Sequence, residues 1–154
     1  AAGALEFRDV RFGYASRPGE EALRGISFSI PRGSCTAVVG HSGSGKTTLG
    51  RLLMRFHDPG AGQVLLDGRP FPSLQPQWLR RQIGYVEQEP RLFNETLWNN
   101  IRYGRLDAPS EEIFGAAMAA NILQFMQSLP QGLETNVGRF GQNLSGGQKQ
   151  RVAI

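Results

Sequence analysis

The sequence predicts an α/β fold with three parts. A central unit joins a strand to a helix through a glycine-rich loop, an antiparallel β part surrounds it in the first half, and a helical part occupies roughly residues 90–150. Three observations predict this arrangement. Apolar residues with helical spacing follow the glycine-rich loop, the first thirty residues alternate between apolar and polar positions, and the second half carries helix-capping residues.

The β part begins with two alternating segments. Residues 5–12 alternate apolar and polar side chains, and residues 22–30 do the same with Leu23, Ile26, Phe28 and Ile30, so both predict half-buried strands. A turn over residues 13–20 separates them. A third short strand and turn is predicted at residues 63–68.

The central unit matches the pattern G-x-x-x-x-G-K-[ST] of a phosphate-binding loop. Its residues are Gly40, His41, Ser42, Gly43, Ser44, Gly45, Lys46, Thr47 and Thr48. Glycines at these positions allow backbone angles closed to other residues and leave room for an anion among the N–H groups. Lys46 brings a positive charge to the outer phosphates, and the hydroxyl of Thr47 suits Mg²⁺, which prefers oxygen ligands.

The flanks of this loop match what a phosphate site needs. Residues 36–39 are short, apolar and β-branched, which predicts a buried parallel strand. Apolar residues at helical spacing follow over residues 48–56, and the helix is expected to end near residues 57–60. The positive end of its dipole then points at the phosphates.

The second half is predicted to be mostly helical. A short helix is expected at residues 76–82, a strand at residues 83–86, and a helix capped by Asn94 or Thr96 that runs to about Tyr103. Ser110 is the predicted cap of the next helix, which carries Ile113, Ala116, Ala117 and Ala120 on one side. Another helical segment is expected at residues 121–129.

Composition narrows the function classes. The chain has 154 residues, 40% of them hydrophobic, and no apolar run approaches the roughly 18 residues of a membrane span. The net charge of +4 suits an anionic ligand, but the arginines are scattered, which argues against nucleic acid as a partner. Cys35 is the only cysteine and is expected to be a small buried residue. Both ends are expected to be cut from a longer protein.

A second stretch with chemical meaning is Leu144-Ser145-Gly146-Gly147-Gln148. Ser145 is the predicted cap of a helix whose first turn carries two glycines, which gives a second exposed helix N-terminus able to bind an anion. This stretch resembles the signature motif of the ATP-binding-cassette (ABC) transporter family. Together with the phosphate-binding loop it is highly specific, and the resemblance covers nearly the whole chain. The segments Phe12-Gly13-Tyr14 and Val86-Glu87-Gln88-Glu89-Pro90 are similar to the exporter branch.

The resemblance implies a role for each motif. Tyr14 would stack on adenine, residues 40–48 would hold the phosphates of ATP, and Thr47 and Gln88 would contact Mg²⁺. Lys46 and Gln88 would be the catalytic residues, with Gln88 reaching the attacking water. Ser145, Gly146, Gly147 and Gln148 would contact the ATP bound by a second nucleotide-binding domain in a head-to-tail dimer.

The resemblance also implies an ABC ATPase fold that is incomplete at its C-terminus. Residues 1–88 would form the β part with the phosphate-binding core, residues 89–145 the helical part, and residues 146–154 the start of the signature helix. Residues 91–100 would lie near the surface that receives helices of a transmembrane domain. The parent protein would be an ATP-hydrolysing exporter in a membrane, with this domain on the cytosolic, mitochondrial matrix or stromal side.

The sequence departs from the family pattern in two places. The family usually has an acidic residue after Val-Gly, where this chain has Arg139. The family's apolar strand that ends in Asp-Glu and its later switch histidine, which would neighbour the loop strand and complete the Mg²⁺ site, do not occur by residue 154. We therefore expect the chain alone to be inactive in hydrolysis, with an open apolar edge beside the loop strand.

Two other functions fit parts of the sequence. A small-molecule kinase would use the phosphate-binding loop but has no need of residues 144–148. A soluble ABC ATPase acting in DNA repair or translation would use both motifs, although the similarity to exporters over residues 78–93 favours a transporter.

Overall fold

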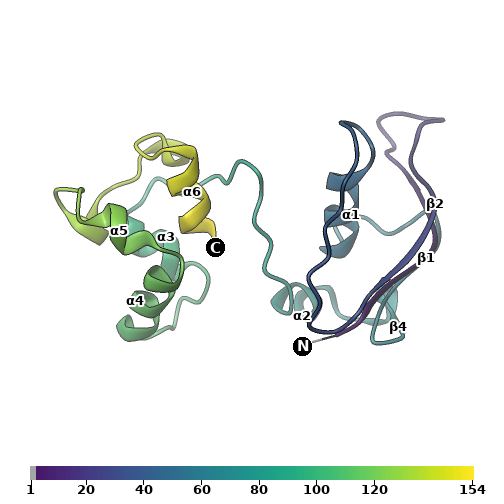
Figure 1. Ribbon diagram of the computed structural model, residues 1–154, viewed down its shortest axis with the longest axis horizontal. Coiled ribbons are helices and arrows are strands. Elements are labelled where there is room, and N and C mark those ends of the chain that lie inside the picture. Colours follow the sequence, from purple (N-terminus) through teal and green to yellow (C-terminus); the bar gives the residue numbers. More distant parts are fainter. Residues whose placement is uncertain (1–2) are drawn as a thin grey trace. The chain divides into compact units, whose positions relative to one another are not determined.

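The computed structural model describes residues 3–154, which divide into two compact units with the boundary between Gly84 and Tyr85. We call residues 3–84 the β unit and residues 85–154 the helical unit, and each is described by itself. Strands lie in the first unit and most helices in the second, as the sequence predicts (Figure 1).

The β unit contains a four-stranded antiparallel sheet in the order β2-β1-β3-β4. The strands are β1 (Leu5–Gly13), β2 (Glu21–Ile30), β3 (Ala61–Leu66) and β4 (Arg69–Pro70). The two alternating segments predicted in the first thirty residues are confirmed as β1 and β2, which pair directly with each other. The strand predicted within residues 63–68 is confirmed as β3, and an Asp67-Gly68 turn connects it to β4.

A bulge in β1 breaks the strict alternation that the sequence suggests. Asp9 has a φ angle of 45°, and the register with β2 shifts between Phe7 and Val10. Phe7 and Val10 are therefore both buried although they are three positions apart. Without the bulge, Asp9 would occupy the buried position; instead its N–H donates to the hydroxyl of Ser27 at 2.8 Å.

The helix that follows the glycine-rich loop packs on the core of this sheet. It is α1 (Lys46–Leu53), and its Leu52 lies in one buried cluster with Phe7, Val10 and Phe12. The helix starts at the loop as predicted but ends several residues before residues 57–60, because Arg55 adopts a left-handed backbone conformation with φ of 49°. The short helices η1 (Phe71–Ser73) and α2 (Pro76–Arg81) complete the β unit.

Two predicted strands are wrong. Residues 36–39 and residues 83–86 are irregular, and Val39 in the first segment is 88% exposed. A strand needs a partner for its backbone N–H and C=O groups, and no segment within residues 3–154 pairs with either one. Cys35, expected to be buried, is exposed for the same reason, since it lies just before the unpaired segment.

The helical unit contains α3 (Leu97–Arg102), α4 (Ser110–Ala119), α5 (Ile122–Met126) and α6 (Gly146–Ala153), with 3₁₀ turns η2 (Gly132–Glu134) and η3 (Arg139–Gly141). Thr96 caps α3 as predicted, accepting a bond from the N–H of Asn99 at 3.1 Å. The predicted cap of α4 is displaced by one residue: Pro109 takes the cap position and Ser110 is the first helical residue.

The core of the helical unit is formed by apolar side chains from all four helices. Leu97, Ile122 and Val137 are almost completely buried in it. Ala117 and Ala120 of the predicted apolar side of α4 are buried as well, whereas Ala116 is exposed. No helix within residues 3–154 has the length and apolar character needed to cross a membrane.

Candidate nucleotide-binding site

The glycine-rich loop curls tightly before α1. Gly43 and Gly45 have φ angles of 80° and 92°, in the region that favours glycine. At Gly45 a Cβ atom would also lie 2.7 Å from a methyl carbon of Leu23 and 2.8 Å from the carbonyl oxygen of Ala22. The unusual angles expected of the loop glycines are therefore observed at Gly43 and Gly45, while Gly40 has no positive φ.

The side chain of Lys46 closes the loop into a ring. Its Nζ donates to the carbonyl oxygens of Gly40 and His41, both at 2.7 Å, and lies 3.4 Å from the hydroxyl of Ser44. The N–H of Ser44 also donates to the carbonyl of His41 at 3.2 Å. The ammonium group thus lies beside residues 40–44 of the loop, which are exposed to solvent.

The N-terminus of α1 presents free backbone donors at the same place. The cap residue Gly45 has no side chain to satisfy them, and the first residues of an α-helix lack intrahelical acceptors for their N–H groups. Thr47 is exposed in the first turn with its hydroxyl available. Donors, helix dipole and Lys46 together form a compact site for a multiply charged anion.

Tyr14 is tied to this helix by its hydroxyl group. The hydroxyl lies 3.1 Å from the Oγ1 of Thr48, which is only 5% exposed, and Arg51 Nη1 donates to it at 3.2 Å. The Tyr14 ring packs edge-on against Phe12 and His57, with ring centroids 4.9 and 5.6 Å apart. The structure therefore brings Tyr14 and the phosphate-binding loop together within the β unit.

Sequence reasoning missed Arg51 as a partner of Tyr14. Its guanidinium carbon also lies 5.7 Å from the centre of the Tyr14 ring. The available signal was its spacing: Arg51 follows Thr48 by three residues, so both side chains lie on one face of α1.

His41 and Ser42 contact each other within the loop. Nδ1 of His41 lies 2.8 Å from the carbonyl oxygen of Ser42, and both residues are exposed. Within residues 3–154, their side chains make no contact that suggests a chemical role beyond forming the loop.

The signature stretch forms a well-capped helix start in the helical unit. The Ser145 hydroxyl accepts from the N–H of Gln148 at 3.3 Å, and the Gln148 amide oxygen accepts from the N–H of Ser145 at 2.8 Å. This reciprocal pair is a capping box and confirms the predicted cap. A Cβ atom at Gly146 or Gly147 would meet nothing within 4 Å, so this end of α6 is open.

Gln88 lies in the same unit as the signature helix. Its side chain is exposed, and its carbonyl oxygen accepts a bond from Nε2 of Gln150 on α6 at 3.0 Å. The backbone at Gln88 is thereby attached to the helix that begins at the signature.

Arg139, the departure from the family pattern, is exposed beside an aromatic ring. Its guanidinium carbon lies 5.2 Å from the centre of the Phe140 ring, and that of Arg91 lies 5.5 Å from the same ring. The positive charge at this loop is therefore accommodated on an aromatic surface.

Comparison with known proteins decides the family. Residues 23–154, most of the chain, match the family described as ABC transporter. This chain is a member of the ABC transporter family. A solved structure described as a bacterial Atm1-family ABC exporter with ATP bound matches 98% of the chain with a TM-score of 0.93 and 46% sequence identity. The predicted ABC ATPase fold, with its antiparallel sheet and helical part, is confirmed.

Relatives in the ABC family come from animals and plants. The chain is 50% identical over 153 residues to the mitochondrial potassium channel ATP-binding subunit of Homo sapiens, and 51% identical over 152 residues to ABC transporter B family member 19 of Arabidopsis thaliana. It covers 21% of the human protein, 12% of the plant protein and 26% of the Atm1-family chain. The chain thus corresponds to about a fifth of the length of its human relative.

Proposed function

We propose that this chain is the ATP-binding domain of an ABC exporter. The observation that carries the proposal is the ring closed by Lys46 at the N-terminus of α1, where the ammonium group, the helix dipole and free N–H donors converge. A triphosphate carries the multiple negative charges that these groups attract. Adenine would lie against Tyr14, which the hydroxyl of Thr48 holds next to the loop.

Two residues would hold Mg²⁺ together with the phosphates. Thr47 of the β unit offers an exposed hydroxyl oxygen, and Gln88 of the helical unit offers an exposed amide oxygen. Within residues 3–154 no group of His, Cys, Asp and Glu side chains forms a metal centre of its own. Mg²⁺ takes few protein ligands and completes its shell with phosphate oxygens and water. When bound, Mg²⁺ would neutralise part of the charge on the phosphates.

In the full-length protein we expect ATP hydrolysis. Phosphoryl transfer depends mainly on positioning and charge neutralisation. Lys46 would hold the outer phosphates, and the side-chain amide of Gln88 would orient the attacking water. The isolated 154-residue chain should hydrolyse ATP poorly, because its sequence lacks the Asp-Glu pair that the family uses to complete the Mg²⁺ site and activate the water.

A second nucleotide-binding domain would complete the site. The open N-terminus of α6, with Ser145, Gly146 and Gly147, offers donors that a phosphate on another subunit can reach. Gln148 supports this surface through the capping box. We therefore expect a head-to-tail dimer, in which each phosphate-binding loop holds a nucleotide that the other subunit's signature also contacts.

The other partner would be a transmembrane domain of the same protein. Close likeness to an Atm1-family exporter supports export across a membrane over a kinase or a soluble ATPase. The domain would then lie on the cytosolic, matrix or stromal side of that membrane, where ATP is available.

The test is a titration with a fluorescent ATP analogue. Lys46→Ala removes the ammonium group from the loop, and a lost charge-assisted contact should weaken binding about tenfold to a hundredfold. Arg24→Ala, which removes a positive charge on β2 outside the loop, is the matched control and should bind as wild type does. Equal affinity of wild type and Lys46→Ala would refute the proposed site.

A further inference from the structure

The C-terminal end of α1 is held by an unusual pair of arginines. The helix ends in a reversed turn: the N–H of Arg55 donates to the carbonyl of Leu52, and the N–H of Phe56 donates to the carbonyl of Arg51, both at 2.9 Å. This is the Schellman arrangement, in which the residue after the cap adopts a left-handed conformation and is usually glycine. Here that residue is Arg55, with φ of 49°.

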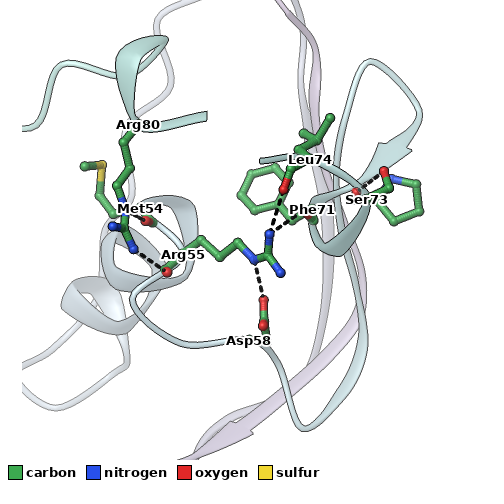
Figure 2. Close-up of polar contacts among 8 residues, drawn as sticks. Met54, Arg55, Asp58, Phe71, Ser73, Leu74 and Arg80 are labelled. Carbon is green, nitrogen blue, oxygen red and sulfur yellow. Dashed lines mark hydrogen bonds and ion pairs between the residues drawn. The ribbon is translucent and has the colours of Figure 1, made fainter. Parts of the chain in front are cut away.

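The side chain of Arg55 makes contacts that offset the strain of its left-handed backbone conformation. Its Nη1 donates to the carbonyls of Phe71 and Leu74 at 3.0 and 2.8 Å, and its Nε donates to Asp58 at 2.9 Å. The side chain is only 16% exposed. Figure 2 shows the guanidinium group of Arg55 reaching from the end of α1 to the backbone of η1.

Arg80 approaches the same helix end from α2. Its Nε donates to the carbonyl of Met54 at 3.0 Å, and its Nη2 donates to the carbonyl of Arg55 at 3.1 Å (Figure 2). Its guanidinium carbon lies 5.3 Å from the centre of the Phe56 ring. The last carbonyls of a helix lack intrahelical donors and carry the negative end of the dipole, so a cation with two donors suits this position.

We propose that Arg80 is a positioning residue that binds α2 to the C-terminal end of α1, while Arg55 holds the same helix end to η1, so that nucleotide binding at the N-terminus of α1 is transmitted to α2. This proposal rests on the proposed function, because it requires ATP at residues 40–48. Lys46 and Thr47 lie at one end of an eight-residue helix, and the two arginines hold its other end. A helix this short has little stability of its own, so its position depends on such tertiary contacts.

The consequence concerns the segment that follows α2. The chain runs from α2 through residues 82–87 to Gln88. A helix that responds to the nucleotide would therefore be separated only by residues 82–87 from the glutamine expected to reach the attacking water. The contacts that the structure describes for Arg80 are with the carbonyls of Met54 and Arg55 and with the Phe56 ring, all outside residues 40–48.

The test is hydrogen exchange of the full-length protein with and without ATP. In wild type, ATP should slow exchange at residues 40–48 and also at α2. In Arg80→Ala the slowing at residues 40–48 should persist while that at α2 disappears. Arg81→Ala is the matched control, since this neighbour on the same helix has no hydrogen bond or ion pair within the part of the chain that the structure describes. It should behave as wild type.

Two further measurements distinguish a positioning role of Arg80 from a general contribution to stability. Arg80→Lys keeps the charge but replaces the planar fork with one ammonium group, so it should restore only part of the slowing at α2. The affinity for ATP should change less than about threefold in Arg80→Ala, because each contact to the phosphates is retained. The wild-type measurement stands even if Arg80→Ala does not fold.

The outcomes distinguish this proposal from the function on which it rests. No slowing at residues 40–48 in wild type would refute ATP binding at the loop, and the coupling with it. Slowing at residues 40–48 without slowing at α2 would refute the coupling alone. Equal slowing of α2 in wild type and Arg80→Ala would show that the arginine does not transmit the change.

Discussion

The hydroxyl and the ring of Tyr14 should have separable roles, and two substitutions test this. Tyr14→Ala removes the ring that would stack on adenine, which should weaken ATP binding by about 1 kcal/mol, or about fivefold in Kd. Tyr14→Phe keeps the ring and removes only the hydroxyl, so ATP affinity should stay within about twofold of wild type. Inorganic triphosphate, which has no base, should bind all three proteins alike.

The hydroxyl of Tyr14 should contribute to folding stability rather than to ATP affinity. Its partner Thr48 is 5% exposed, so removing the hydroxyl leaves a buried group without this bond. The free energy of unfolding should fall by about 1 kcal/mol in Tyr14→Phe. The assays are competition titrations with ATP and triphosphate, and urea unfolding for stability. If Tyr14→Ala weakens ATP and triphosphate equally, Tyr14 supports the loop rather than the base.

Three further predictions concern the helix end, the signature and the sheet. Arg55→Gly should be less destabilising than Arg55→Ala by about 1 kcal/mol in urea unfolding, since both lose the guanidinium but only glycine is unstrained at this φ; equal loss would contradict the strain. Ser145→Arg should retain nucleotide binding but prevent ATP-dependent dimerisation of the full-length protein, and an unchanged ATP-bound dimer in light scattering would exclude the shared site. The N–H of Ala4, followed by the Arg32 guanidinium, lowers the pKa of Asp67 below its ordinary value of 3.8. Because the pKa of Asp67 is lower in the folded state, its stabilisation is present above the unfolded pKa and is lost as the pH falls through the folded pKa. Wild type should therefore lose more free energy of unfolding than Asp67→Asn between about pH 5 and pH 2. Parallel losses in the two proteins would show that Asp67 contributes nothing.

The sequence predicted those strands, helix caps and loops that are determined by residues close together in the chain. The alternation in β1 and β2 is visible residue by residue, and the caps at Thr96 and Ser145 bond to the residue three positions later. The phosphate-binding loop is equally local, since Gly43 and Gly45 set its path and Lys46 closes it. Each of these features is encoded within a few neighbouring positions.

Features that depend on distant partners were not predictable in the same way. Residues 36–39 have the composition of a buried strand, but a strand forms only beside another strand, and composition cannot supply one. The bulge at Asp9 depends on Ser27 in the neighbouring strand. Arg80 contacts carbonyls 25 and 26 residues earlier in the chain. No local pattern marks that arginine as different from Arg81.

The central claim is that the backbone of the glycine-rich loop binds the triphosphate of ATP. The most direct measurement follows the backbone amide resonances of the 154-residue chain by NMR during titration with ATP and Mg²⁺. The resonances of Gly43, Gly45, Lys46 and Thr47 should shift in wild type, and inorganic triphosphate should shift the same set. In Lys46→Ala the resonances of Gly43, Gly45 and Thr47 should need about tenfold to a hundredfold more of either ligand to shift as far. If ATP shifts resonances elsewhere and leaves the loop amides of wild type unmoved, the account of this site is wrong.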